Sequence, residues 1–129
     1  MKVVAVDYGS ARTGVAVSDP TGTLARPLGV VERASEEAGL QRLVDLIRAE
    51  EAERVVVGLP LTLRGERGAQ AQETEAFVEA LRAAVDVPVE SFDERFTTKL
   101  ARTAPGPDDA RAAAHLLSSY LEWSSAGRE

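Results

Sequence analysis

Acidic residues stand at three separated places in this chain, each where a strand is predicted to end or a helix to begin. Asp7 follows the apolar run Val3–Val6, and Asp93–Glu94 follow a second apolar stretch. Asp108–Asp109 precede a helical pattern. A carboxylate at the end of a buried strand needs a compensating partner, because burying an unpaired charge is costly. Strand ends and a helix N-terminus can meet at one sheet edge, so we expect these acids to converge there.

A divalent cation is the natural partner for converging carboxylates. The chain has no cysteine, and His115, its only histidine, lies on a different helix face from Asp109. Oxygen ligands alone favour Mg²⁺ or Mn²⁺ over zinc. Two such ions about 4 Å apart can activate a water molecule and stabilise the leaving oxygen of a phosphodiester. The acids therefore indicate metal-dependent phosphodiester hydrolysis.

Each acidic position also has a purely structural interpretation. Asp7 could cap a turn through local backbone hydrogen bonds. Asp93 could cap a short helix, and Asp108 and Asp109 could be N-cap and first-turn residues stabilised by the helix dipole. Taken one at a time, the last two interpretations are at least as good as a functional one. The combination of the three places favours a site.

The composition is that of one globular domain. Hydrophobic residues make up 44% of the 129 residues, a length that fits a single core. We expect residues 1–123 to form the domain and 124–129 to be a disordered tail. The pattern shows no membrane-spanning run and no signal peptide, so we expect a cytoplasmic protein.

The charge argues against a protein that coats nucleic acid through a broad positive field. Fifteen basic and 21 acidic residues give a net charge of −6. A local groove remains compatible with this charge, because nearly all the basic residues are arginines, whose planar fork suits phosphate.

Hydrophobic periodicity predicts three strands followed by alternating helices and strands. Pro27 fits the third strand if that strand is an edge or carries a bulge, and Ser35 is a candidate N-cap for the first helix. Three successive strands suggest an antiparallel meander, and the helix-to-strand alternation predicts parallel crossovers. The assembled order matches an α/β fold of the ribonuclease H-like kind, a mixed five-stranded sheet with helices on both faces. The predicted elements are strands at 3–8, 14–18, within 24–31, 55–59 and 87–92, and helices at about 36–47, 69–85, 94–102 and from 108.

Several ordered blocks of this sequence resemble the YqgF/RuvX family, the Holliday-junction resolvases related to RuvC. The resemblance covers nearly the whole chain. It implies a ribonuclease H-like, cytoplasmic, metal-dependent nuclease, associated in the family with maturation of the 5′ end of pre-16S rRNA and with resolution of branched DNA. The blocks are residues 7–19, 25–28, 57–61, 93–98 and 109–120.

The resemblance also implies site residues. The family acids carry over onto Asp7, Glu94 and Asp109, with Asp93 as a further neighbour that could bind metal. In the implied mechanism Asp7 bridges two ions, Glu94 and Asp109 hold one each, and the 3′ oxygen leaves. Glycine permits close backbone approach, so Gly58 with Pro60 is expected to shape the floor of the cleft.

Substrate contacts are expected from residues beside these acids. Arg12 and Arg95 are candidates for neutralising a phosphate, unless each merely forms a surface ion pair. Members of the family usually carry a longer basic segment before the last helix, which here shrinks to residues 103–107, so substrate binding should depend less steeply on salt. The full set expected to contact substrate is Gly9, Arg12, Arg26, Arg95 and Thr97.

Two other functions fit parts of the pattern. A turn of this kind after a first strand also occurs in actin-like ATPases and sugar kinases, but those enzymes close two lobes around ATP and this chain supplies one. A nuclease fold can also serve as a non-catalytic nucleic-acid-binding or ribosome-assembly factor, because a fold does not guarantee turnover. Structured RNA and branched DNA both remain open as substrates, and so do a monomer and a homodimer.

Overall fold

The computed structural model describes residues 1–61, 64–96 and 109–125 of the chain. Its elements alternate much as the sequence predicts. The strands are β1 (Val3–Asp7), β2 (Arg12–Ser18), β3 (Ala25–Glu32), β4 (Arg54–Leu59) and β5 (Val89–Asp93). The helices are α1 (Glu37–Ala49), α2 (Ala69–Ala84), the short 3₁₀ helix η1 (Glu94–Phe96) and α4 (Asp109–Ser125).

The five strands form one mixed sheet in the order β3-β2-β1-β4-β5. The pairs β1–β2 and β2–β3 are antiparallel, whereas β1–β4 and β4–β5 are parallel. The predicted meander followed by parallel crossovers is therefore confirmed. Strand β3 is an edge, and its pairing with β2 shifts register between Val15 and Ala16, next to Pro27. Pro27 is therefore accommodated both by the edge position of β3 and by the register shift, the two situations in which a sheet tolerates proline.

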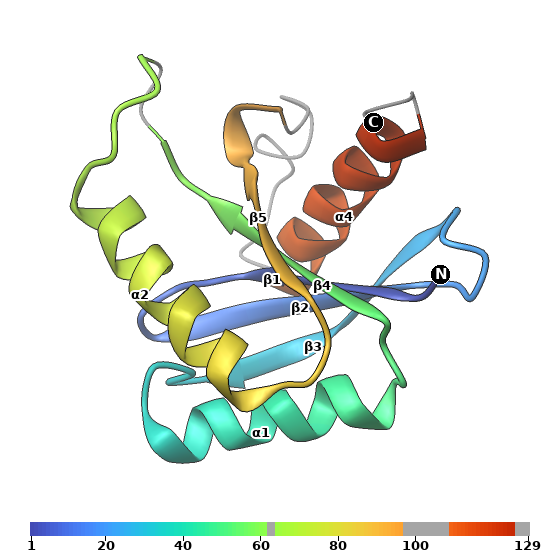
Figure 1. Ribbon diagram of the computed structural model, residues 1–129, viewed down its shortest axis with the longest axis horizontal. Coiled ribbons are helices and arrows are strands. Elements are labelled where there is room, and N and C mark those ends of the chain that lie inside the picture. Colours follow the sequence, from blue (N-terminus) through green and yellow to red (C-terminus); the bar gives the residue numbers. More distant parts are fainter. Residues whose placement is uncertain (62–63, 97–108, 126–129) are drawn as a thin grey trace.

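Helices cover both faces of the sheet, with α1 and α2 on one side and α4 on the other (Figure 1). Strand β1 is buried on both faces, which explains its continuous apolar run. Val4 and Val6 pack toward α1 and α2, and Val3 and Ala5 pack toward α4. Because side chains alternate along a strand, Asp7 falls on the α4 side of the sheet.

The start of α1 differs from the prediction that Ser35 caps it. The N-cap is Glu36, whose side chain makes no capping hydrogen bond. Arg33 has a positive φ of 52°, and a β-carbon at Gly39 would lie 2.0 Å from its carbonyl oxygen. Close packing of the backbone over Gly39 therefore sets where α1 begins, which no capping rule would reveal.

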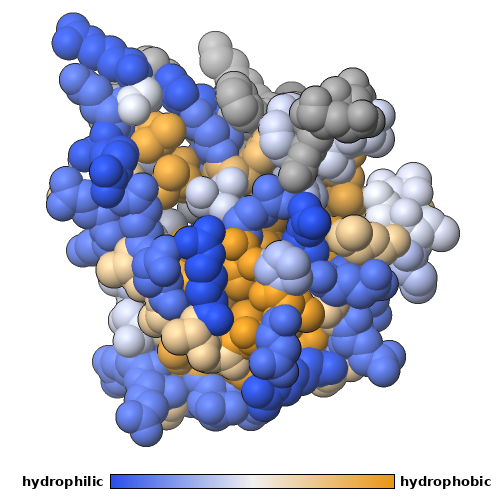
Figure 2. Space-filling model, viewed as in Figure 1, coloured by the Kyte–Doolittle hydropathy of each residue, from blue (hydrophilic) through white to orange (hydrophobic). Residues whose placement is uncertain are grey.

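Helix α4 continues through Ser125, so residues 124 and 125 of the expected tail are helical. Within the described ranges, no helix is long and apolar enough to cross a membrane. Figure 2 shows apolar surface in the middle of one face, where β4 and β5 lie in Figure 1, with hydrophilic side chains around it.

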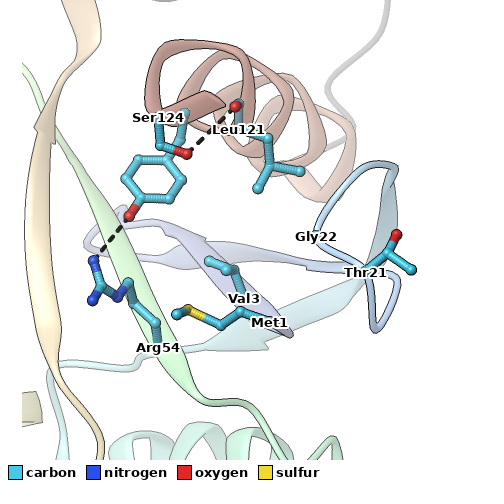
Figure 3. A pocket seen from close by; sticks show the side chains of 8 residues that line it. Met1, Val3, Thr21, Gly22, Arg54, Leu121 and Ser124 are labelled. Carbon is cyan, nitrogen blue, oxygen red and sulfur yellow. Dashed lines mark hydrogen bonds between the residues drawn. The ribbon is translucent and has the colours of Figure 1, made fainter. Parts of the chain in front are cut away.

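The C-terminal half of α4 is fixed by a polar cluster at the sheet end away from Asp7. Arg54 donates from Nη1 to Glu90 Oε1 at 2.8 Å and to the Tyr120 hydroxyl oxygen at 3.3 Å. The Tyr120 hydroxyl in turn donates to Glu90 Oε1 at 2.5 Å. Tyr120 is only 3% exposed, so it belongs to the core. Tyr120 lines a pocket of about 390 Å³ together with Val3 and Leu121. Figure 3 shows Val3, Arg54 and Leu121 around this pocket.

Candidate functional site

Asp7, the last residue of β1, lies between glycines of both neighbouring strands. The register pairs it directly with Gly14 of β2. One step beyond the Val6–Val57 pair, the register of β1 and β4 places Gly58 on its other side. Residues paired in this way share a face of the sheet. The glycine row, Gly14–Asp7–Gly58, therefore faces α4 and leaves open space on either side of the carboxylate.

The first turn of α4 fills the space above Gly14. A β-carbon at Gly14 would lie 1.8 Å from the carbonyl oxygen of Asp109 and 3.0 Å from the nitrogen of Ala110. Any residue larger than glycine would collide with this backbone. The contact holds the N-terminus of α4, and Asp109 with it, against the end of β1.

The side chain of Glu94 fills the space above Gly58. A β-carbon at Gly58 would lie 2.7 Å from Glu94 Oε2. Glu94 reaches this position because β5 ends beside β4, at Asp93 opposite Leu59, and η1 begins immediately afterwards. Asp7, Glu94 and Asp109 thus come from three distant segments to the same end and the same face of the sheet. The expected floor role of Gly58 agrees with this contact.

The Asp7 carboxylate is in an electrostatically costly position. Burial, and to a smaller extent the negative charge of Asp109, raise its pKa from the ordinary 3.8 to about 6. Among the residues that the structure describes, no hydrogen bond is donated to this carboxylate and no cation pairs with it. The turn-capping interpretation of Asp7 therefore finds no support.

Two arginines neutralise other acids of the site. Arg12 Nε lies 2.9 Å from Asp109 Oδ2. Arg95 binds Asp93 through Nε, at 2.9 Å from Oδ2, and its backbone N–H donates to Asp93 Oδ1 at 2.9 Å. These bonds to Arg95 lower the pKa of Asp93. Asp93 therefore caps η1, the structural alternative considered above, and holds an arginine in place of facing Asp7.

The arrangement suits a cation, although it is not a closed metal cage. In the part of the chain described here, no group of three histidine, aspartate or glutamate side chains is placed so that it could hold an ion. Asp109 is turned toward Arg12 instead. The unpaired carboxylate of Asp7, with a second acid close enough to raise its pKa, is nevertheless a set of hard oxygen donors that a divalent cation would stabilise.

The other predicted contact residues are placed differently. Gly9 lies in the turn after β1, where a β-carbon would meet the Arg12 carbonyl oxygen at 2.4 Å, so its small size is needed by the turn. Arg26 pairs with Val17 in the sheet and approaches Glu50 at 3.9 Å, several residues along the strands from Asp7. The structure therefore does not bring Arg26 to the acids. Thr97 and Asp108 lie outside the described residues.

The role of Gly14 was missed by sequence reasoning. The signal was available, since Gly14 is the residue that a hairpin between β1 and β2 places opposite Asp7. Reading it requires the register of the hairpin, which follows from the length of the turn over residues 8–11 and not from composition.

Replacing Gly14 with alanine should destabilise the protein by about 3 kcal/mol, the upper end of the usual cost of overpacking, because the new β-carbon meets main-chain atoms that cannot rotate away. Gly29→Ala is the matched control, since no atom lies within 4 Å of a β-carbon there. The control should change stability by less than about 0.5 kcal/mol. Urea unfolding of both variants measures this, and equal stabilities would contradict the close approach of α4.

The stability of the metal-free protein should depend on ionisation of Asp7. Because its folded pKa of about 6 lies above the ordinary 3.8, ionised Asp7 destabilises the fold above pH 6 by about 3 kcal/mol, and this cost fades as pH falls through 6 toward 4. Asp7→Asn should therefore be more stable than the wild type at about pH 8 and equally stable near pH 4. Denaturant unfolding in chelator tests this, and a wild type as stable as the variant at high pH would refute it.

Comparison with known proteins agrees with this fold. A relative from Desulforudis audaxviator named "Putative pre-16S rRNA nuclease" is 38% identical over 139 residues, which cover 99% of each chain. A relative of the same name from Chloroflexus aurantiacus is 44% identical over 96 residues, which span 74% of this chain but 63% of the relative's length.

The fold resembles RuvC. The Thermus thermophilus RuvC bound to a Holliday junction superposes with a TM-score of 0.68 over 98% of this chain and 96% of that one, at 18% identity. This confirms the predicted ribonuclease H-like fold. The RuvX family, described as Holliday junction resolvase, matches residues 1–123. With that match and the relatives above, the chain belongs to the RuvX family.

Proposed function

We propose that this protein is a metal-dependent nuclease that hydrolyses phosphodiester bonds of structured nucleic acid at the end of β1. The observation that carries the proposal is the glycine row, which lets Asp109 and Glu94 approach Asp7 from either side. An unpaired, partly buried carboxylate between two other acids has no evident value for folding. Membership of the RuvX family supports the nuclease over an actin-like ATPase.

Mg²⁺ or Mn²⁺ would be held by Asp7, Glu94 and Asp109. Asp7 occupies the middle of the row, with Glu94 on one side and Asp109 on the other, so these three carboxylates would hold the ions. Asp93 is less suited, because Arg95 already occupies its oxygens. When bound, such ions supply positive charge that polarises the phosphate and lowers the pKa of water.

Arg12 and Arg95 would contact the substrate's phosphates. Each guanidinium lies beside one flank of the acids, Arg12 on Asp109 and Arg95 on Asp93. Their positive charge offsets the repulsion between the acids and a phosphodiester, and their planar fork matches two phosphate oxygens. Gly9 contributes by keeping the turn that carries Arg12 tight. Thr97 remains part of the proposed contact set.

The substrate is either the 5′ region of pre-16S rRNA, as the names of the relatives suggest, or a branched DNA, as the family description suggests. Cleaving one RNA end needs a single site, so a monomer suffices. Resolving a four-way junction needs two symmetric cuts and therefore a homodimer. Either substrate would place the activity in the cytoplasm.

The direct test is cleavage by the wild type and by Asp7→Asn. We expect Mg²⁺- or Mn²⁺-dependent cleavage of a pre-16S rRNA fragment or a four-way DNA junction, reduced more than about 100-fold in Asp7→Asn, since loss of a metal ligand should exceed the effect of losing an outer partner. Thermal unfolding checks that the variant is folded. Binding without product under any metal would favour a non-catalytic assembly factor, and stabilisation by ATP would favour a kinase-like lobe.

The variant Gly58→Ala should affect activity more than stability, so it tests the position of Glu94 apart from folding. The atoms nearest to the new β-carbon would be Oε2, Cγ and Cδ of the Glu94 side chain, which can rotate away, so stability should fall less than in Gly14→Ala. The displaced carboxylate should nevertheless lower kcat/KM by about 100-fold, the usual effect of a shift of about 1 Å. Gly29→Ala should retain full activity. Unchanged kcat/KM in Gly58→Ala would show that the position of Glu94 does not matter for cleavage.

A further inference from the structure

Besides the pocket next to Tyr120, the protein has a hollow at the same end of the sheet as the acids, on the opposite face. Its volume is about 370 Å³, and its walls come from the turn after β1, the segment before α1, and α2. Tyr8, the residue directly after Asp7, lines it and packs with the core on the side of α1 and α2. Asp7 and Tyr8 are consecutive residues, but Asp7 faces the acidic site and Tyr8 faces this hollow on the other side of the sheet. We call the hollow the Tyr8 pocket.

The Tyr8 pocket is built around an aromatic pair. The rings of Tyr8 and Phe77 stack with centroids 4.3 Å apart and planes 21° from parallel. Leu40 and the small side chains Ala76 and Ala80 complete the apolar part of the lining. Within this pair Phe77 is buried, at 4% exposure, whereas Tyr8 is half-buried. An aromatic side chain that borders an apolar hollow can accept a nucleobase, because every base has a π-face that can stack.

The polar groups of the pocket favour a neutral occupant over a phosphate. The lining side chains that carry polar groups are the hydroxyl-bearing Tyr8, Ser10 and Ser35 and the carboxylate Glu73. No lysine or arginine is among the described residues that line the pocket. Glu73 repels an anion but can accept hydrogen bonds from an exocyclic amino group, which adenine, cytosine and guanine carry. The chemistry therefore selects an amino-bearing base, with its phosphates outside.

The walls are held in place without a ligand. The backbone N–H of Arg33, before α1, donates to the carbonyl oxygen of Ala11 in the turn after β1 at 3.0 Å. Gly39 lets α1 pack directly on the carbonyl of Arg33. In that turn, the buried hydroxyl of Thr13 donates to the carbonyl oxygen of Gly9 at 3.2 Å. A preformed pocket of this kind binds without first paying an ordering cost.

We propose that the Tyr8 pocket binds an unpaired, amino-bearing nucleobase of the same strand whose phosphate is cleaved at Asp7. The proposal rests on the proposed nuclease function and refines it. The protein would recognise a single-stranded or extruded nucleotide next to the cut, and the base would lie on one side of the sheet end while the phosphodiester lies on the other.

The experiment places 2-aminopurine, a fluorescent amino-bearing base that is quenched on stacking, at successive unpaired positions of an RNA stem-loop and of a four-way DNA junction. Binding is measured with Asp7→Asn, so that cleavage does not interfere. Ala76→Phe is added to fill the pocket from α2. The matched control is Ala83→Phe, which alters an exposed alanine two turns further along the same helix and outside the lining. Thermal unfolding verifies that both variants are folded.

We expect quenching at one position of the bound strand, its loss in Ala76→Phe, and affinity reduced about 5- to 150-fold, the range for one stacked base. Ala83→Phe should behave like its parent. Tight binding with no quenching, or with equal affinity in Ala76→Phe and Ala83→Phe, overturns the pocket and leaves the nuclease proposal intact. Failure of the parent to bind either nucleic acid overturns both. A change of oligomeric state in Ala76→Phe alone would assign the hollow to a contact between copies instead.

Discussion

The rest of the site depends on one constraint, the absence of side chains at the two glycines that flank Asp7 in the sheet. Without side chains at Gly14 and Gly58, the start of α4 can lie on β2, and Glu94 can lie on β4. The sheet then holds Asp7 in the middle, at a fixed strand end. On the Gly14 side the site is set by main-chain packing, which is stiffer than side-chain contacts. This suits a reaction that needs its ligands positioned to a fraction of an ångström.

This packing has an electrostatic cost that the fold offsets elsewhere. Burial and, to a smaller extent, the approach of Asp109 raise the pKa of Asp7. Arg12 and Arg95 each compensate one of the neighbouring acids. The buried layer between the sheet and α4, together with the Arg54–Glu90–Tyr120 cluster, holds the far end of this helix. The helix is thus anchored at both ends, so the stability of the core supports an arrangement of charges that is unfavourable alone.

Much of this could be predicted from the sequence, for identifiable reasons. The valine runs of β1 and β4 predicted two central strands, because strands that are buried on both faces have continuously apolar sequences. The acids at strand ends and at the start of α4 pointed to the correct sheet edge. The placement of Arg26 could not be predicted, because strand register decides its distance from Asp7. For Asp93 the sequence left two interpretations open, and the structure shows that Arg95, two residues away, occupies its oxygens. The Tyr8 pocket lay beyond prediction, since it joins three segments that no local pattern connects.

The most direct test of the account is a crystal structure of the protein soaked in Mn²⁺, with the ions located by their anomalous scattering. The account predicts at least one Mn²⁺ bound to the carboxylate of Asp7 together with an oxygen of Glu94 or Asp109, with Arg12 withdrawn from Asp109. Manganese bound only at other carboxylates, with Asp7 still unligated at a neutral pH, would contradict it.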